Sequence, residues 1–455
     1  MPKNSADLTE GPLLKGLIAY TIPIILTGVL QLLFNAADLV VVGRFCGSIS
    51  VAAVGNCGPV INLLVNLFIG LSVGAGVTVA HGIGANKDED VRRTVHTAIP
   101  LALICGIILS FAGIAGARFI LYLMGTPDNV IRLSTIYMRI YFAGIIASTL
   151  YNFGSAILRA AGDTKSPLFF LTAAGIVNVI LNLLFVIVLK MDVAGVALAT
   201  TLSQIMSAAL VILSLMNRED ACKLKLHELH IYGRQLIKII RIGFPAGIQG
   251  SLFSISNVII QSSVNSFGSI VMSGNAAAQN IEGFVYISMN SVSQTALNYA
   301  GQNHGAGKFD RIKKIMIACL TLAFGTGITI GGLAVLFSRP LLSIYITDSD
   351  EAIKYGIIRL IFICLPYFLC GIMDVATGML RGIGSSIAPM FITVAGVCGF
   401  RILWIYTVFR MPKYHSLEVL YSSYMISWSA TFAIEAIVFC LLLRKMRKNG
   451  VAQIT

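Results

Sequence analysis

An acidic side chain inside a long apolar stretch is the first feature of this sequence that could do chemistry. Asp38 lies about twenty residues into the apolar segment 17–43, a stretch long enough for one membrane-spanning helix. Asn35 and Gln31 precede it by three and seven residues, so a helix would place all three on one face. An ionisable residue at the centre of a bilayer costs at least about 2.5–3.5 kcal/mol, so Asp38 is a functional candidate by default.

A second polar pair falls in the apolar segment 168–189. Asn178 and Asn182 are four residues apart, and this spacing puts both amides on the same face of a helix. Carboxylate and amide oxygens are the hard ligands that small hard cations prefer. A carboxylate with such partners could bind Na⁺ or a proton. The alternative is a hydrogen-bonded network that only holds the helices together.

The composition indicates which elements must position these side chains. The 455 residues are 56% hydrophobic and only 12% charged, whereas a soluble domain has about 25% charged residues. A spanning helix needs about 20 mainly apolar residues, and nearly the whole chain divides into such segments. They are 17–43, 51–80, 95–117, 132–158, 168–189, 194–216, 238–266, 271–300, 315–337, 353–380, 387–409 and 417–443. We therefore predict an all-α integral membrane protein with twelve transmembrane helices.

The net charge of +13 is better explained by membrane orientation than by a nucleic acid partner. Lys and Arg gather in every second loop, and cytoplasmic loops of membrane proteins carry this excess. The pattern predicts a multi-pass protein of the cell inner (plasma) membrane with both termini in the cytoplasm. Arg444–Lys448 would then form a basic cytoplasmic tail. We expect no cleaved signal peptide, because the N-terminus lacks its charged and apolar regions.

The two halves of the sequence resemble each other. Motifs of the first half recur about 222 residues later, which is the signature of an internal repeat. The pairs are Gly84-Ala85-Asn86-Lys87 with Gly305-Ala306-Gly307-Lys308, Leu158-Arg159 with Leu380-Arg381, and Ile22-Pro23 with Phe244-Pro245. Parallel repeats are a known transporter architecture. We predict two pseudo-symmetric six-helix lobes, residues 1–216 and 237–455, joined by a polar cytoplasmic linker, 217–236.

These motifs together resemble a known family. They are Pro23, Asn35-x-x-Asp38 with Val42-Gly43, the loop at 84–87, Leu158-Arg159-Ala-Ala-Gly162-Asp163, Gly301-Gln302-Asn303-x-Gly305-Ala306-Gly307 and Leu380-Arg381-Gly382-x-Gly384. The chain is similar, over most of its length, to the multidrug and toxic compound extrusion (MATE) family, in its bacterial and archaeal branch with an acidic first helix. The resemblance implies a two-lobed secondary antiporter. Such a protein expels organic cations and drug-like amphiphiles in exchange for H⁺ or Na⁺ by alternating access.

The resemblance also implies a coupling-ion site in the first lobe. Asp38, Asn178 and Thr200 match the cation-site positions of this branch, whereas relatives often carry a second acid where this chain has Asn182. With one carboxylate, a single proton or a single Na⁺ would neutralise the site, so the sequence leaves the ion and its stoichiometry open. We expect Asn35 to contribute to the site. We expect no cofactor besides the coupling ion.

The second lobe has intramembrane charges of its own, because Ile260 stands where the repeat aligns Asp38. These charges are Glu282, Asp374, Arg401 and Glu435. Glu282 and Asp374 could contact a cationic substrate or each other, and the plainer alternative is an internal ion pair with Arg401. A substrate cleft is predicted at Gln31, Gln249, Asn257, Glu282, Tyr286 and Asp374.

Other function classes fit less well. A flippase for a lipid-linked precursor, from the same superfamily, would need basic residues in its cavity to hold a pyrophosphate. Export of one specific endogenous metabolite stays open, since the sequence does not reveal the natural substrate. An enzyme is not expected, because the chain has no clustered catalytic constellation, no Walker-type phosphate loop and no Cys/His metal cluster. We expect a monomer in the lipid bilayer that handles a small molecule.

Overall fold

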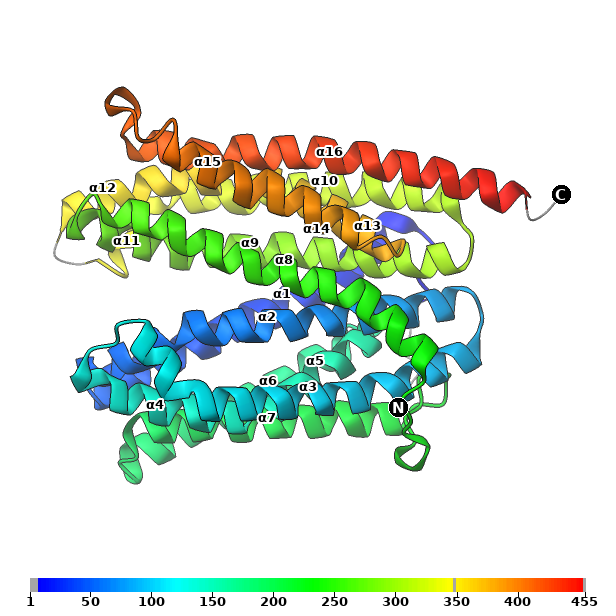
Figure 1. The fold of residues 1–455 in the computed structure, drawn as a ribbon, viewed down its shortest axis with the longest axis horizontal. Coiled ribbons are helices and arrows are strands. Elements are labelled where there is room, and N and C mark those ends of the chain that lie inside the picture. The colour runs from blue at the N-terminus through cyan, green and yellow to red at the C-terminus, as the bar shows by residue number, and fades with distance from the viewer. Residues whose placement is uncertain (1–6, 347–348, 453–455) are drawn as a thin grey trace. The chain divides into compact units, whose positions relative to one another are not determined.

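The computed structural model describes residues 7–346 and 349–452, and within them the chain is helical and contains no strand. Figure 1 shows the helices coloured along the chain. They are α1 (Leu13–Phe45), α2 (Ser48–Gly84), α3 (Asp88–Leu123), α4 (Asp128–Ala143), α5 (Ile145–Ala160), α6 (Lys165–Leu183), η1 (Leu184–Val188), α7 (Asp192–Met216), η2 (Leu226–Glu228), α8 (Gly233–Asn265), α9 (Ser269–Gly305), α10 (Phe309–Leu336), α11 (Ser338–Ser343), α12 (Asp350–Arg359), η3 (Leu360–Cys364), α13 (Tyr367–Gly382), α14 (Ile387–Thr393), η4 (Val394–Gly399), α15 (Phe400–Tyr406), η5 (Pro412–Tyr414) and α16 (Leu417–Ala452).

The spans follow the predicted order. Nine of the described helices are long and apolar enough to cross a bilayer, and two bent pairs add one span each. These pairs are α4 with α5, bent by 46°, and the helix Asp350–Cys364 with α13, bent by 40°. The remaining long helix, α9, has 37 residues, which is ample for a span, but it is more polar than the others. The described residues thus hold nine to eleven candidate spans, and α9 would complete the predicted twelve. The predicted all-α membrane fold is confirmed.

The internal repeat reappears in the backbone. The helices α2 and α9 occupy equivalent positions in the two halves, and each has 37 residues. Residues with positive φ, a conformation that glycine adopts at no steric cost, recur at matching places. The pairs are Gly47 (91°) with Gly268 (96°), Asn86 (52°) with Gly307 (67°), and Gly162 (85°) with Gly384 (88°). The same turns therefore enter and leave the same helices in both halves.

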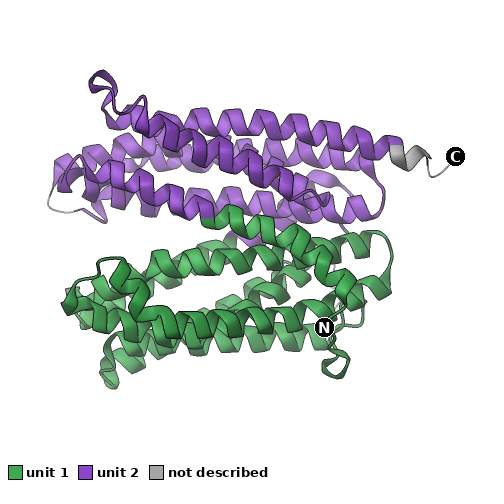
Figure 2. Cartoon of the chain, viewed as in Figure 1, with its two compact units in different colours: residues 1–7, 26–251 green, residues 8–25, 252–455 purple. Residues whose placement is uncertain are grey.

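The chain forms two compact units, coloured separately in Figure 2. Unit 1 holds residues 26–251, and unit 2 holds residues 8–25 together with the chain from 252 onward. This division differs from a cut at the linker, since the first part of α1 belongs to unit 2 and the first part of α8 belongs to unit 1. The first helix of each half thus begins packed on the opposite half.

Two glycine pairs explain why α8 begins in unit 1. Gly70 and Gly74 on α2 face Gly243 and Gly247 on α8, so each helix presents a Gly-x-x-x-Gly motif to the other. An added Cβ at Gly74 would lie 2.2 Å from the Ile239 carbonyl oxygen, and one at Gly70 would lie 2.2 Å from the Gly247 nitrogen. Small residues allow helix backbones to approach this closely, and such contacts drive helix association in membranes.

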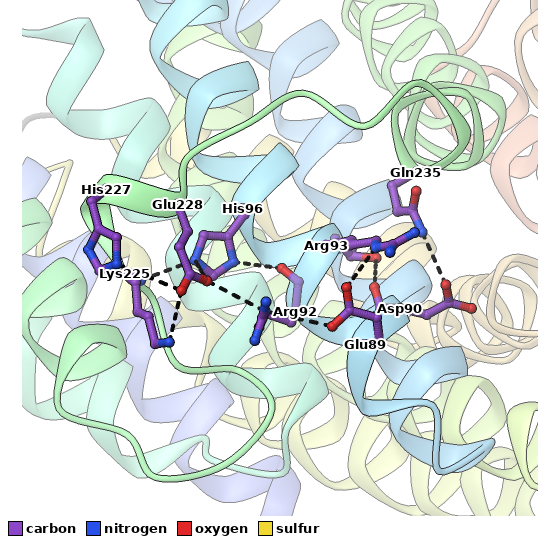
Figure 3. A network of polar contacts seen from close by, with 10 residues as sticks. Glu89, Asp90, Arg92, Arg93, His96, Lys225, His227, Glu228 and Gln235 are labelled. Carbon is purple, nitrogen blue, oxygen red and sulfur yellow. Dashed lines mark hydrogen bonds and ion pairs between the residues drawn. The ribbon is translucent and has the colours of Figure 1, made fainter.

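The polar linker before α8 is also held by unit 1, mainly through His96 on α3 (Figure 3). His96 is only 2% exposed. Its Nδ1 lies 2.7 Å from the Arg92 carbonyl, so Nδ1 donates, and Nε2 is left to accept the Lys225 N–H at 3.1 Å. Glu228 returns from the linker to within 3.5 Å of Arg92, and Thr97 Oγ1 accepts the Tyr232 N–H at 3.1 Å.

The start of the linker is fixed by charge. Arg218 Nε donates to Asp220 Oδ1 at 2.9 Å, and Asp220 Oδ1 also accepts the Cys222 N–H at 3.0 Å. Burial disfavours the charged carboxylate of Asp220, but the hydrogen bond and charge of Arg218 outweigh burial and hold the pKa of Asp220 below its ordinary value. The Asp220 carboxylate therefore stays ionised and keeps the end of α7 tied to the linker.

The segment that precedes α1 is held by hydrogen bonds to α9 in unit 2. Gln302 Oε1 accepts the Leu8 N–H at 3.1 Å, and Asn303 Nδ2 donates to the Leu8 carbonyl at 3.0 Å. Within α1, the hydroxyl oxygen of Thr21 lies 2.8 Å from the hydroxyl oxygen of Thr295 on α9. These bonds to α9 account for the assignment of the first part of α1 to unit 2.

We predict that His96→Ala loosens the linker. The change leaves the partly buried Lys225 N–H without its acceptor, at a cost of about 1–2 kcal/mol, which corresponds to roughly a 5- to 30-fold increase in the undocked state. Trypsin should then cleave the purified protein faster after Lys223 and Lys225. The matched control is His227→Ala, since the His227 side chain is 79% exposed. Equal cleavage of the two variants would contradict a clamp at His96.

We also predict that Gly74→Ala destabilises the protein. Its methyl group would collide with the Ile239 carbonyl, and overpacking of this kind costs about 1–3 kcal/mol. Gly55→Ala, on the same helix, meets nothing within 4 Å and should leave stability unchanged or slightly raise it. Thermal unfolding in detergent compares the two. If Gly74→Ala unfolds at the wild-type temperature, the glycine contact does not hold α8 to α2.

Candidate cation site

A close contact between α1 and α6 places Asp38 beside the paired asparagines. A Cβ added at Gly175 on α6 would lie 1.8 Å from Cε2 of Phe34, so the Phe34 ring occupies the space that a side chain would fill. Asp38 follows Phe34 by one helical turn, and Asn178 follows Gly175 by nearly one turn. The contact therefore aligns the carboxylate of α1 with the amides of α6.

Four predicted residues meet in one hydrogen-bonded cluster within unit 1. Asn182 Nδ2 donates to Asp38 Oδ1 at 2.5 Å and to Asn178 Oδ1 at 3.2 Å. From α7, Thr200 Oγ1 lies 3.3 Å from Asp38 Oδ2, and Asn178 Nδ2 donates to Thr200 Oγ1 at 3.5 Å. Three helices thus contribute one carboxylate, two amides and one hydroxyl, as the sequence predicted.

The cluster has more acceptors than hydrogens. Asn178 is 4% exposed and Asn182 is 1% exposed. Among the described residues, no group donates to the buried Oδ1 of Asn182. Thr200 has one hydroxyl hydrogen but faces two acceptors, Asp38 Oδ2 and the Val196 carbonyl at 3.0 Å. A small cation could contact several of these surplus oxygens at once, and a proton on Asp38 would supply one of the missing hydrogens.

A π-helical turn, η1, begins two residues after Asn182. Such turns are rare, appear mainly as single bulges within α-helices, and are frequent at functional sites. Here the turn ends the regular part of the span immediately beyond the cluster. The backbone next to Asn182 is therefore a natural place for the helix to bend.

The other residues predicted for unit 1 lie outside the cluster. Asn35 and Gln31 are exposed on α1, and Gln249 is buried on α8 at 3% exposure. A role for Asn35 at the ion site stays a prediction, as does the role of Gln31 and Gln249 in binding substrate.

In unit 2, Glu282 forms an ion pair, with a different arginine from the one proposed. Arg359 Nη2 lies 2.6 Å from Glu282 Oε2, and Arg359 Nη1 donates to Asn275 Oδ1 at 2.7 Å. Arg359 was not predicted as a partner. It stands near the start of its predicted span, and an arginine there usually extends its charged end to the membrane surface. Arg359 is 4% exposed.

Arg401, the proposed partner, has an aromatic environment instead. Its guanidinium carbon lies 3.8 Å from the centre of the Tyr424 ring and 5.4 Å from the Trp428 ring. Its Nε donates to Ser427 Oγ at 3.0 Å. Desolvated cation–π contacts of this kind contribute about 2 kcal/mol, so Arg401 is held without Glu282. The alternative of a Glu282–Arg401 pair is wrong.

The remaining predicted cleft residues of unit 2 are spread over three helices. Asn257 on α8 is exposed, Tyr286 on α9 is 45% exposed, and Asp374 on α13 is half-buried. Asp374 also contributes its carbonyl, which accepts a hydrogen bond from Ser293 Oγ at 2.6 Å. Their part in substrate binding stays a prediction.

We predict that Gly175→Ala disturbs the cluster through Phe34. The new methyl group overlaps the ring, and the overpacking should cost about 1–3 kcal/mol. Thermal unfolding should show this loss, and the double variant with Phe34→Leu should recover most of it, because the smaller side chain leaves room for the methyl group. The two changes would then be strongly non-additive. Additive losses would mean that the two residues do not share one packing site.

Comparison with known proteins agrees with the fold. The MatE family matches residues 23–184 and 245–407. The probable multidrug resistance protein YoeA of Bacillus subtilis is 27% identical over 427 residues, which cover 92% of this chain and 91% of that protein. The probable multidrug resistance protein NorM of Thermotoga maritima is 26% identical over 423 residues, with 92% and 90% covered. A crystal structure of MATE in complex with MaL6 matches with a TM-score of 0.91 at 21% identity, covering 98% of this chain and all of that chain (100%). The chain belongs to the MatE family of multi-pass membrane transporters.

Proposed function

We propose that this transporter is a secondary active exporter of organic cations and drug-like amphiphiles. It would exchange them for H⁺ or Na⁺ by alternating access, with Asp38 as the residue that carries the coupling ion. The observation that supports this most directly is the Asp38 carboxylate, which meets Asn178, Asn182 and Thr200 in a cluster short of hydrogens. We further propose a location in the plasma membrane with both termini in the cytoplasm.

The mechanism follows from the charge of one side chain. With an ion or proton bound, Asp38 is neutral. Without it, the site carries a negative charge in a low-dielectric interior, and an unpaired charge there costs several kcal/mol. The empty site therefore favours either reloading with an ion or the approach of a cationic substrate. The coupling ion and the cationic substrate would each stabilise the Asp38 carboxylate, but not at the same time. This competition is a sufficient physical basis for the exchange of one for the other.

The chemistry of the cluster bears on the stoichiometry. Asp38 is the one acid among its four residues, because position 182 is an asparagine. One monovalent ion neutralises one carboxylate, so we propose one H⁺ or one Na⁺ per cycle at this site. Na⁺ would take oxygens from Asp38, Asn178, Asn182 and Thr200, which are hard ligands of suitable type.

The charge distribution also disfavours the lipid-precursor flippase. A pyrophosphate needs available arginine or lysine side chains. Two of the arginines within spans are engaged already, Arg359 with Glu282 and Arg401 with Tyr424 and Ser427. The two relatives described above are named as multidrug resistance proteins, which supports drug-like substrates. Export of a specific endogenous metabolite remains the alternative.

We predict that Asp38→Asn abolishes coupling. The variant keeps the shape of the side chain but no longer gains or loses charge, so gradient-driven export of a cationic dye should fall at least about tenfold. Proteoliposomes with an imposed H⁺ or Na⁺ gradient measure this, with dye efflux as the readout. The gradient that drives the wild-type protein identifies the ion.

The matched control is Asp128→Asn, the same chemical change at an exposed position at the start of α4. It should export at the wild-type rate. Dye binding in detergent should survive in both variants, which separates a coupling defect from misfolding. Gradient-driven export by Asp38→Asn at the wild-type rate would place the coupling ion elsewhere.

A further inference from the structure

A second carboxylate is fully buried in unit 2, where the repeat has no counterpart of Asp38. Glu435 lies on α16 and is 0% exposed. Its carboxylate faces Thr377 on α13 and Thr393 at the end of α14. The sequence predicts Glu435 only as an intramembrane charge, and neither the Asp38 cluster nor the Glu282–Arg359 pair uses it.

A count of hydrogens indicates which form of Glu435 fits this pocket. Thr393 Oγ1 makes its closest contact with the Pro389 carbonyl, which can only accept, so the single hydroxyl hydrogen of Thr393 is used there. The same Oγ1 lies 3.0 Å from Glu435 Oε1. A hydrogen between these two oxygens stabilises the contact, and with the hydroxyl hydrogen of Thr393 directed at Pro389, a proton on Glu435 would supply it.

The second threonine agrees with this assignment. Thr377 Oγ1 lies 2.8 Å from Oε1 and 3.1 Å from Oε2 of Glu435. If Oε1 carries the proton and donates to Thr393, then Thr377 donates to Oε2, and every polar atom of the three side chains is satisfied. If Glu435 is ionised, its Oε1 faces a lone pair of Thr393 across 3.0 Å, which is repulsive.

Two charged groups of α13 act on Glu435 in opposite directions. Asp374 disfavours a negative charge there, and Arg381 favours one. Both lie on the helix that also supplies Thr377.

We propose that Glu435, held between Thr377 and Thr393, is a proton-binding carboxyl of the C-terminal unit that takes up and releases a proton independently of Asp38. A proton suits this pocket better than a metal cation. Hard cations such as Mg²⁺ and Ca²⁺ take about six or more oxygens, whereas the described side chains in contact with Glu435 add two hydroxyls to its carboxylate.

The surrounding backbone can respond to the proton. The π-helical turn η4 begins directly after Thr393, and such turns are common sites of helix bending. A Cβ added at Gly396 in this turn would lie 2.3 Å from Thr431 Oγ1 on α16. Thr431 precedes Glu435 by one turn, so the turn packs directly against the stretch of α16 that carries the carboxyl. Loss of the proton turns the Thr393–Glu435 contact from attractive to repulsive at the edge of a bendable segment.

Infrared spectroscopy of the full-length protein in lipid tests this assignment. The wild-type spectrum should contain a protonated-carboxyl C=O band that is absent from Glu435→Gln and remains in Asp38→Asn. Raising the pH from about 5 to about 9, a range that brackets physiological proton exchange, should remove this band in the wild type. Thr393→Val should retain the band and shift it to higher frequency, because the carboxyl loses its acceptor. This variant also gives an answer if Glu435→Gln does not fold.

The control is Glu351→Gln, since Glu351 is exposed at the start of α12; its spectrum should match the wild type. A Glu435→Gln spectrum with every protonated-carboxyl band intact would overturn the proposal, since Glu435 would then be ionised. A Glu435 band that does not change across the pH range would overturn it as well and make the residue a permanently neutral structural group. Loss of the band on adding Na⁺ at constant pH would overturn the assignment to a proton in favour of Na⁺.

Discussion

The interior of a bilayer contains no water, so a polar side chain there must form its hydrogen bonds and ion pairs with other groups of the protein. This constraint accounts for the polar residues within the spans. Arg359 meets Glu282, and Arg401 meets two aromatic rings and Ser427. Each of these charged groups is held in one arrangement by the named partners. Asp38 and Glu435 differ, because their partners are neutral oxygens and amides, and such partners suit a carboxylate that changes its charge.

Packing makes these arrangements possible. Gly175 leaves the space that Phe34 fills and so aligns α1 with α6, while Gly396 lets η4 pack against Thr431 on α16. In both cases a glycine brings two helices close together one turn away from the carboxylate or its partner. A π-helical turn then follows Asn182 or Thr393. The two sites share a glycine contact between helices, a carboxylate with neutral partners, and a π-helical turn next to one of those partners.

The helices α1 and α8 belong to both compact units, which gives them a special position in the transporter. Thr21 bonds to Thr295 in unit 2, and Asp38 lies further along the same helix in unit 1. In α8 the Gly243 and Gly247 contacts hold the first part to α2, and His96 clamps the linker that leads into it. A charge change at Asp38 therefore acts on a helix whose start is fixed in the other unit.

Much of the fold and the four residues of the Asp38 cluster could be predicted from the sequence. Apolar length marks the spans, and an isolated acid such as Asp38 stands out because charge is costly in a membrane. The spacing of Asn178 and Asn182 puts both amides on one helical face, and the family resemblance indicated that Asn178 and Thr200 belong with Asp38. Arg359 and the Gly-x-x-x-Gly contact were missed, because pairing across helices depends on tertiary packing. The points at which α1 and α8 pass from one compact unit to the other are not marked by any local sequence pattern either, since both helices are continuous in sequence and in backbone.

We propose that substrate and coupling ion compete for one carboxylate, and counting the ions released on substrate binding tests this directly. Calorimetric titration of the purified protein with a cationic dye, in buffers of different ionisation enthalpy, counts the protons released on binding. Repeating the titration over a range of Na⁺ concentrations counts the Na⁺ released, by the reciprocity of linked binding. The account predicts release of about one monovalent ion, H⁺ or Na⁺, for each dye molecule bound, as linkage to a single carboxylate requires. Tight dye binding with no proton released and no dependence on Na⁺ would contradict it.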